Sequence, residues 1–280
     1  ADGATVTFTA NVVTPTPLTF TGTAATNDAA ARIPTQVETA GTAAVINADA
    51  SVTSGYGAVR VDGHATASIT TITLDAYDGA DLGDTGVILG AIETLSLTDS
   101  AAATTLGTDV TALALNVNDI NHAINLDADT ATITDLDITA TAGSSTFALT
   151  AAAVTDLTVT ADAMLDISGS TLGALENVTI SGASAVNLGD ISDSATLVTF
   201  DASANTGGVI ATIETDTDTL TGAISEYIFS DGNDVVTEAS TDDTVETKIT
   251  TGLGDDKVIL DSVTALAVEI DGGEGTDTLH

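Results

Sequence analysis

Three short segments near the C-terminus carry glycine and aspartate at matching positions, a combination suited to binding a divalent cation. They read SDGNDVVTEA at 230–239, TGLGDDKVIL at 251–260 and DGGEGTDTLH at 271–280. Glycine permits a left-handed backbone that can aim carbonyl oxygens at one point, and aspartate adds negative charge. Calcium accepts six to eight oxygen ligands at about 2.3–2.6 Å in a tolerant geometry. These segments are therefore predicted to be calcium-binding turns.

The spacing of the three segments predicts that their ligands lie one above another. One glycine and one aspartate of each segment recur in register, at nearly equal steps along the chain. If one step is one turn of a coil, then neighbouring turns share the cation. The predicted metal-binding residues are Gly232, Asp234, Gly252, Gly254, Asp255, Asp256, Asp271, Gly272, Gly273, Gly275 and Asp277. The first segment keeps only Gly232 and Asp234 of the pattern, so its match to the pattern is partial.

The elements that must position these turns repeat at an interval of about 20 residues, within the range of known solenoid repeats. Apolar anchors recur at nearly constant steps, at Leu113, Leu136, Leu157, Val178 and Val198. Each interval holds a second strand-like segment, such as HAINL at 122–126 or SAVNL at 184–188, and shows no helical period. This pattern favours an all-β chain folded as a parallel β-solenoid, with apolar ladders inside and Thr, Asn and Asp facing water. An antiparallel sandwich of short strands is the alternative.

Changes along the chain predict three parts. All three prolines fall in residues 1–70, where alternating segments such as ATVTFTANVV indicate β-rich structure with irregular connections. Residues 71–225 are predicted to form degenerate solenoid rungs of about 20 residues. Residues 226–280 are predicted to form the calcium-binding rungs. We also expect the chain to be a fragment of a longer protein.

Composition narrows the function classes. The 41 acidic residues against 4 Lys and Arg give a net charge of −37, which excludes nucleic acid as a partner and favours divalent cations. A merely soluble or halophile-like acidic surface is the alternative. Cysteine is absent, which removes disulfides and thiolate metal sites. No apolar run reaches the length of a membrane span, and we expect no membrane insertion.

The C-terminal motifs resemble the RTX calcium-binding repeat of secreted bacterial proteins. GGEGTDTLH at 272–280 fits the nonapeptide G-G-x-G-x-D-x-apolar-x in full, and TGLGDDKVI fits it with Thr251 replacing the first glycine. Upstream, GAIETLSLTDS and LVTFDASANTGG are similar to the degenerate rungs of Caulobacter-type surface-layer (S-layer) proteins. The RTX likeness covers about 50 residues, and the S-layer likeness about 200.

This resemblance implies a structural protein that leaves the cell by type I secretion and folds on meeting external calcium. It implies an extracellular location on the cell surface, with self-association into a lattice. Cell-surface polysaccharide would be contacted by parts outside this chain. RTX repeats usually run in tandem nonapeptides and line both edges of the coil, whereas here only one edge carries the motif. We therefore expect fewer and weaker calcium sites.

Adhesion and polysaccharide degradation are the two alternative functions, whereas the sequence argues against ice binding. An adhesin segment that binds a surface or glycan would have the same rod and turns. A polysaccharide-degrading β-helix enzyme would need bases and paired carboxylates that no spacing here identifies, so we expect no catalytic residues. Ice binding would need a continuous Thr rank, but the matching strand positions are irregular. The acidic turn DAYDGADLGD at 75–84 and the isolated His64 and His122 are predicted to be exposed turn residues.

Overall fold

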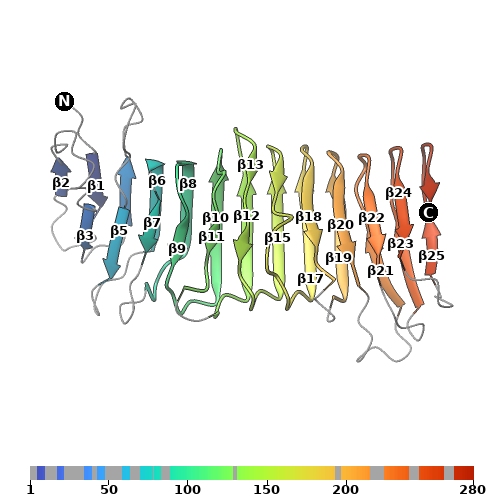
Figure 1. Cartoon of the computed structure of the whole chain (residues 1–280), viewed down its shortest axis with the longest axis horizontal. Helices are drawn as coiled ribbons and strands as arrows, with labels where there is room; N and C mark the ends of the chain where they lie inside the picture. Colours follow the sequence, from blue (N-terminus) through green and yellow to red (C-terminus); the bar gives the residue numbers. More distant parts are fainter. Residues whose placement is uncertain are drawn as a thin grey trace. The chain divides into compact units, whose positions relative to one another are not determined.

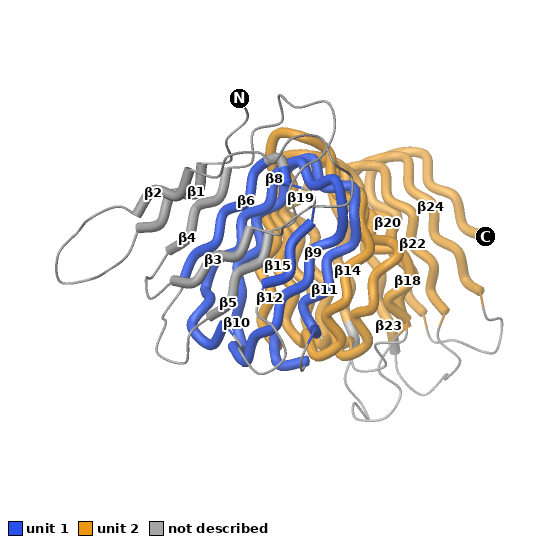
Figure 2. The backbone as a smooth tube through the Cα atoms, turned by 60° about the vertical axis from the view of Figure 1, so that its left-hand side comes forward, with its two compact units in different colours: residues 1–133 blue, residues 134–280 orange. Residues whose placement is uncertain are grey.

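A computed structural model describes the backbone of five strands before residue 64 and most of the chain after it. The described ranges beyond these strands are 70–77, 79–82, 89–128, 131–192, 197–214, 224–239, 246–261 and 268–280. Described residues are in strands or in the turns between them, and the chain divides into two compact units, residues 1–133 and 134–280. Figure 2 draws the units in different colours.

Two rows of strands build the first unit. The first row, in spatial order, is β2 (Leu18–Thr21), β1 (Thr5–Thr9), β4 (Ala43–Asn47), β6 (Thr71–Tyr77), β8 (Thr94–Ser100) and β10 (Ala112–Asn118). The second row is β3 (Thr35–Thr39), β5 (Val59–Gly63), β7 (Ala80–Leu82), β9 (Thr104–Leu106) and β11 (Ile124–Asn125). Strand β1 pairs antiparallel with β2 and β4, whereas the pairs from β4 to β6 and from β3 to β5 onward are parallel.

Two rows of parallel strands also build the second unit. The first row is β12 (Asp135–Ala140), β15 (Asp156–Ala161), β17 (Asn177–Gly182), β19 (Thr199–Asn205), β21 (Ile224–Ile228), β23 (Glu246–Thr250) and β25 (Val268–Asp271). The second row is β13 (Ser145–Thr146), β16 (Leu165–Asp166), β18 (Val186–Asp190), β20 (Val209–Ile213), β22 (Val235–Glu238), β24 (Lys257–Leu260) and β26 (Thr278–Leu279). The second unit also contains the short strand β14 (Leu149–Thr150). Figure 1 shows these rows as stacked rungs.

Apolar residues of successive rungs form ladders inside the coil. Leu136, Leu157 and Val178 pair in register, and so do the apolar residues two positions further along the same strands. All of these side chains are buried, while the residues between them face outward. A single rung cannot bury its own apolar face, so stacking supplies the burial that stabilises the fold.

One predicted anchor is wrong. Val178 pairs with Phe200, not with Val198, because this rung is longer than the one before it. Val198 is 39% exposed, and Leu197 instead lies in the core, in the position that Leu175 holds one rung earlier. Phe200 is buried in this rung, and its ring stacks on Phe229 with 4.6 Å between ring centroids. The core therefore does contain aromatic anchors.

The prediction of an all-β parallel solenoid is confirmed. Parallel pairing from β4 onward rules out the antiparallel sandwich as the architecture of the described rungs. A strand, β1, lies where the alternating segment ATVTFTANVV predicts one. The division at residues 70 and 225 stays a prediction. Within the described part of the chain, no helix is long and apolar enough to cross a membrane.

Candidate metal centre

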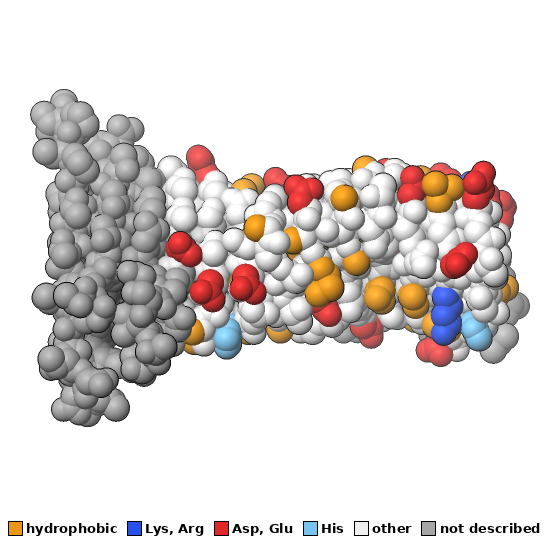
Figure 3. All heavy atoms as spheres, turned by 90° about the horizontal axis from the view of Figure 1, so that it is seen from above, with side chains coloured by type: hydrophobic (Ala, Val, Ile, Leu, Met, Phe, Trp, Pro, Cys, Tyr) orange, Lys and Arg blue, Asp and Glu red, His pale blue; other side chains and the backbone are white. Residues whose placement is uncertain are grey.

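The three glycine-aspartate segments are the tight turns that lead from the first row of the second unit into its second row. We call residues 230–234, 252–256 and 273–277 the Gly-Asp turns. They connect β21 to β22, β23 to β24 and β25 to β26, at the upper edge of the rungs in Figure 1. Figure 3 looks onto this edge and shows acidic side chains over the C-terminal rungs as well as along the rungs before them. The turns therefore stack on one edge of the coil, as their spacing predicts.

Three aspartates form a ladder across these turns. The backbone N–H of Asp234 donates to Asp256 Oδ1 at 2.9 Å, and the N–H of Asp256 donates to Asp277 Oδ1 at 3.2 Å. Below them, the N–H of Val209 donates to Asp234 Oδ1 at 2.6 Å. Each carboxylate thus bonds to the backbone of the rung before it. We call this set the aspartate ladder.

A second ladder runs beside the first. Asn233 Oδ1 accepts a hydrogen bond from the N–H of Asp255 at 2.9 Å, and Asp255 Oδ1 accepts one from the N–H of Thr276 at 2.8 Å. Asp271 lies at the end of β25, where its Oδ1 accepts the N–H of Gly273 at 3.1 Å. Asp255 and Asp271 are exposed, unlike the first two members of the aspartate ladder.

The glycines let the turns stack without gaps. Gly252, Gly254, Gly273 and Gly275 all have positive φ, from 70° to 147°. A Cβ on Gly273 would collide with the carbonyl oxygen of Gly252, and one on Gly275 with that of Gly254. A Cβ on Gly272 would lie 2.6 Å from Asp277 Oδ2. Glycine is therefore required both by the backbone conformation and by the approach of the next turn.

Asp256 has a carboxylate oxygen that no protein group satisfies. The residue is 2% exposed, and its Oδ2 has no hydrogen-bond partner. The nearby Thr251 hydroxyl donates to the carbonyl oxygen of Gly272 at 3.1 Å. Burial raises the pKa of the Asp256 carboxyl, the Asp234 N–H and the Thr251 hydroxyl oppose this rise, and the charges of Asp277 and Asp255 add to it. A buried unpaired carboxylate is costly unless a cation or proton neutralises it.

Asp234 is also buried, but its carboxylate is fully bonded. It is 1% exposed, and it accepts three hydrogen bonds from Ser230 and Val209. Burial raises the pKa of this carboxyl to about 6, against the opposing effect of those hydrogen bonds. The charge of Asp256 adds to the increase. Asp234 therefore titrates above the range of an exposed aspartate.

This shift predicts that the metal-free protein gains stability on mild acidification. The folded pKa of about 6 lies above the unfolded value of 3.8, so between these pH values the folded state binds the proton more tightly. Above pH 6 the ionised Asp234 carboxylate lowers the free energy of unfolding. Protonation removes this penalty as the pH falls toward 4. Urea unfolding in EDTA at pH 5.0 and 7.5 should show wild type gaining about 1 kcal/mol more than Asp234→Asn on acidification. An equal gain in both proteins would contradict the assignment.

The structure adds residues that the motif did not identify. Asn205 is fully buried and caps the rung below the first Gly-Asp turn. Its Oδ1 accepts the N–H groups of Gly207 and Gly208, and its Nδ2 donates to the carbonyl oxygen of Ser184. The segment NTGG at 205–208 carries a signal that could have found it, since it has paired glycines one rung before Gly232.

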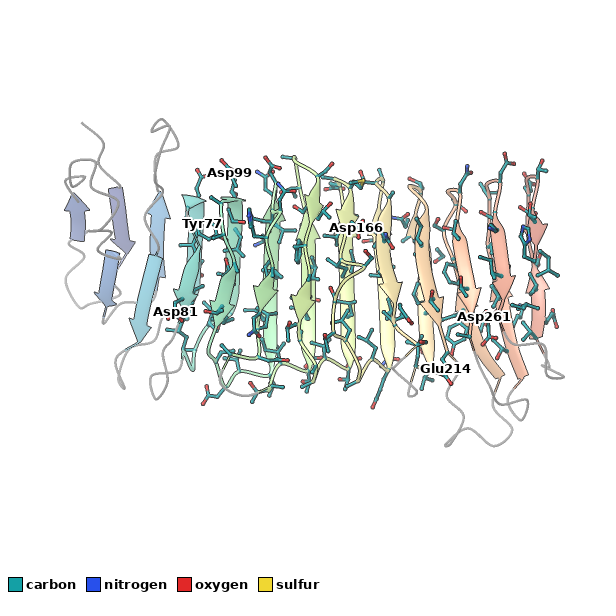
Figure 4. The ribbon with its side chains drawn as sticks, in the orientation of Figure 1. Tyr77, Asp81, Asp99, Asp166, Glu214 and Asp261 are labelled. Atoms are coloured by element: carbon teal, nitrogen blue, oxygen red, sulfur yellow. The ribbon has the colours of Figure 1, made fainter. Side chains whose placement is uncertain are left out.

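Other acidic residues do not join this centre. Among the residues that the structure describes, no three His, Asp or Glu side chains converge on a ready-made metal site. Figure 4 shows Asp81 and Asp99 at opposite ends of the first unit's rungs, and Glu214 and Asp261 toward the edge away from the Gly-Asp turns. Asp81 is exposed, as predicted, and accepts the Thr105 hydroxyl, but it lies in strand β7 and not in a turn. Asp78, Asp84 and His64 lie outside the described residues.

His122 is an exposed turn residue, as predicted. Its Nδ1 lies 3.0 Å from the carbonyl oxygen of Ser100. This contact fixes the ring at the turn by a backbone group, and within the described ranges the ring belongs to no cluster of metal-binding side chains.

No protein-family model, curated protein or solved structure gives a significant match to this chain.

Proposed function

We propose that this chain is a structural segment of a bacterial cell-surface layer, a β-solenoid that calcium stabilises through its Gly-Asp turns. The observation that carries the proposal is the buried, unpartnered Oδ2 of Asp256 within a stack of aspartates and left-handed glycines. Such an oxygen needs a positive neighbour. A cation at this edge would also link one rung to the next.

The chemistry of the turns fits calcium. Hard carboxylate and carbonyl oxygens suit calcium better than a transition metal, and calcium tolerates irregular geometry. Asp256, Asp277 and Asp255 would supply the charge, and the turn carbonyls would supply the remaining ligands. Because no group of three described acidic side chains converges, backbone oxygens must form a large part of the set. When bound, calcium would neutralise the stacked carboxylates and stabilise the folded rungs.

An extracellular location follows from the kind of site proposed. Sites with few carboxylates bind calcium weakly, in the range of extracellular modules at about 0.1–1 mM. Calcium outside cells reaches such levels, so the same site would fill only after export. Type I secretion of the unfolded chain is consistent with this order of events.

The structural role follows from the rungs and the charge. Outward positions of the strands carry Thr, Asn, Asp and Glu, and the chain has a net charge of −37. Such surfaces repel each other unless divalent ions lie between them. Calcium would therefore control both the stability of one molecule and the approach of a second copy.

Calcium-dependent assembly tests this role. Sedimentation velocity and negative-stain electron microscopy of the full chain, with EDTA, magnesium or calcium in the millimolar range, should show ordered self-association in calcium alone. A folded monomer under all three conditions would overturn the lattice role. A glycan array on that monomer would then test the adhesin function.

A further inference from the structure

The first Gly-Asp turn lacks the first of the two glycines that both later turns carry. Ser230 stands four residues before Asp234, where the later turns have Gly252 and Gly273. The positions are equivalent in space, because a Cβ on Gly252 would collide with the carbonyl oxygen of Ser230 in the adjacent turn. The serine therefore stands where the repeat otherwise has a glycine.

The backbone of the first turn differs as well. Gly252 and Gly254 have φ of 90° and 123°, and the corresponding glycines of the last turn have 70° and 147°. Neither Ser230 nor Gly232 has a positive φ. The carbonyl groups of the first turn are thus oriented by a different backbone conformation from those of the two later turns.

Ser230 also supplies hydrogen-bond donors to both oxygens of the Asp234 carboxylate, at the position where a cation would otherwise bind. The Ser230 hydroxyl donates to Asp234 Oδ1 at 2.6 Å, and the Ser230 N–H donates to Asp234 Oδ2 at 2.9 Å. With the N–H of Val209, Asp234 has three donors on its two oxygens. Asp256, one rung later, accepts the Asp234 N–H on Oδ1, but its Oδ2 has no donor.

We propose that the Ser230 hydroxyl takes the place of a cation in the first Gly-Asp turn, so that residues 230–234 close without metal and calcium binds only from Asp256 onward. This inference rests on the proposed calcium function. It assigns Asp234 a metal-free role, in contrast to its place in the predicted set of ligands.

The consequence is a fixed starting rung for calcium-dependent folding. The metal-free turn presents the Asp234 N–H to Asp256, which positions the second turn. Calcium would then secure β23 to β26 on a rung that is already formed. A metal-free platform of this kind lowers the ordering that calcium itself must provide.

Hydrogen exchange of the intact chain, with EDTA or saturating calcium, tests the inference. Amides in 205–214 and 224–239 should exchange equally slowly under both conditions, whereas those in 246–261 and 268–280 should slow by about tenfold or more in calcium. Calcium-dependent protection that begins at 205–239 would overturn the inference and leave the proposed function standing. No calcium effect anywhere would overturn both.

A glycine substitution provides the converse test. Ser230→Gly removes the hydroxyl donor and restores the repeat, so 205–239 should become calcium-dependent and the bound calcium, counted by calorimetry, should rise by one ion. Ser203→Gly is the matched control, because Ser203 also donates to an aspartate, Asp201 Oδ1 at 2.6 Å, outside the Gly-Asp turns. An unchanged ion count and unchanged exchange in Ser230→Gly would contradict the role of the hydroxyl.

Discussion

Asp256→Asn is expected to lower stability in calcium but not in EDTA. The amide keeps an oxygen for the Asp234 N–H, while it removes the buried charge and the unpartnered carboxylate oxygen. In calcium the substitution should lower stability by up to about 2.7 kcal/mol per lost site, the value reached when calcium is a hundredfold above its Kd. In EDTA the same substitution should be neutral or stabilising, because burial raises the pKa of the Asp256 carboxyl and makes its charged form unfavourable there.

Urea unfolding of wild type and Asp256→Asn, each in calcium and in EDTA, measures how the effect of the substitution on stability depends on calcium. Asp137→Asn is the matched control, since Asp137 is an exposed outward residue of β12. It should change stability by less than about 0.5 kcal/mol with or without calcium. Asp277→Ala should resemble Asp256→Asn in calcium. An equal loss from Asp256→Asn in EDTA and in calcium would mean that the carboxylate is structural and holds no cation.

Gly182→Ala is expected to destabilise the solenoid strongly, with or without calcium. Gly182 ends β17 with φ of 106°, and a Cβ there would collide with the backbone of Ala161 in the adjacent rung. Strain in the backbone and separation of the rungs should together cost about 3–5 kcal/mol. Thermal unfolding followed by circular dichroism measures the loss.

Gly173→Ala is the control for this substitution. Gly173 has no positive φ, and a Cβ there would meet nothing within 4 Å. Alanine should therefore leave stability within about 1 kcal/mol of wild type, or raise it by reducing the entropy of the unfolded chain. Similar losses from the two substitutions would show that the contact between adjacent rungs at Gly182 is not what limits stability.

The fold could be predicted because every rung of the solenoid buries apolar residues at equivalent strand positions. Leu136, Leu157 and Val178 keep a constant interval, and the structure places them in one internal ladder. The prediction failed at Val198, because the interval from Val178 to its true partner, Phe200, is longer than the one before it. A constant period could not show this insertion. However, Leu197 and Phe200 have the same spacing as Leu175 and Val178 one rung earlier. Local pattern was thus more reliable there than a constant period.

The position of the candidate site could be predicted from the sequence, but the hydrogen bonds within it could not. Glycine and aspartate spacing identified the edge and the register of the turns. It could not show that Asp234 is saturated by Ser230 while Asp256 keeps a free oxygen, because that difference depends on one hydroxyl and on the local backbone. Asn205 was missed since its cap uses an amide in place of the aspartate of the motif.

Thermal unfolding of the intact chain in EDTA, in millimolar magnesium and in millimolar calcium tests most directly whether the Gly-Asp turns hold calcium. Far-UV circular dichroism should show a higher unfolding temperature and greater β content in calcium, with magnesium close to EDTA, because magnesium demands a stricter octahedral site. Identical unfolding under all three conditions would contradict the account and would make the aspartate ladder a metal-free feature of the fold.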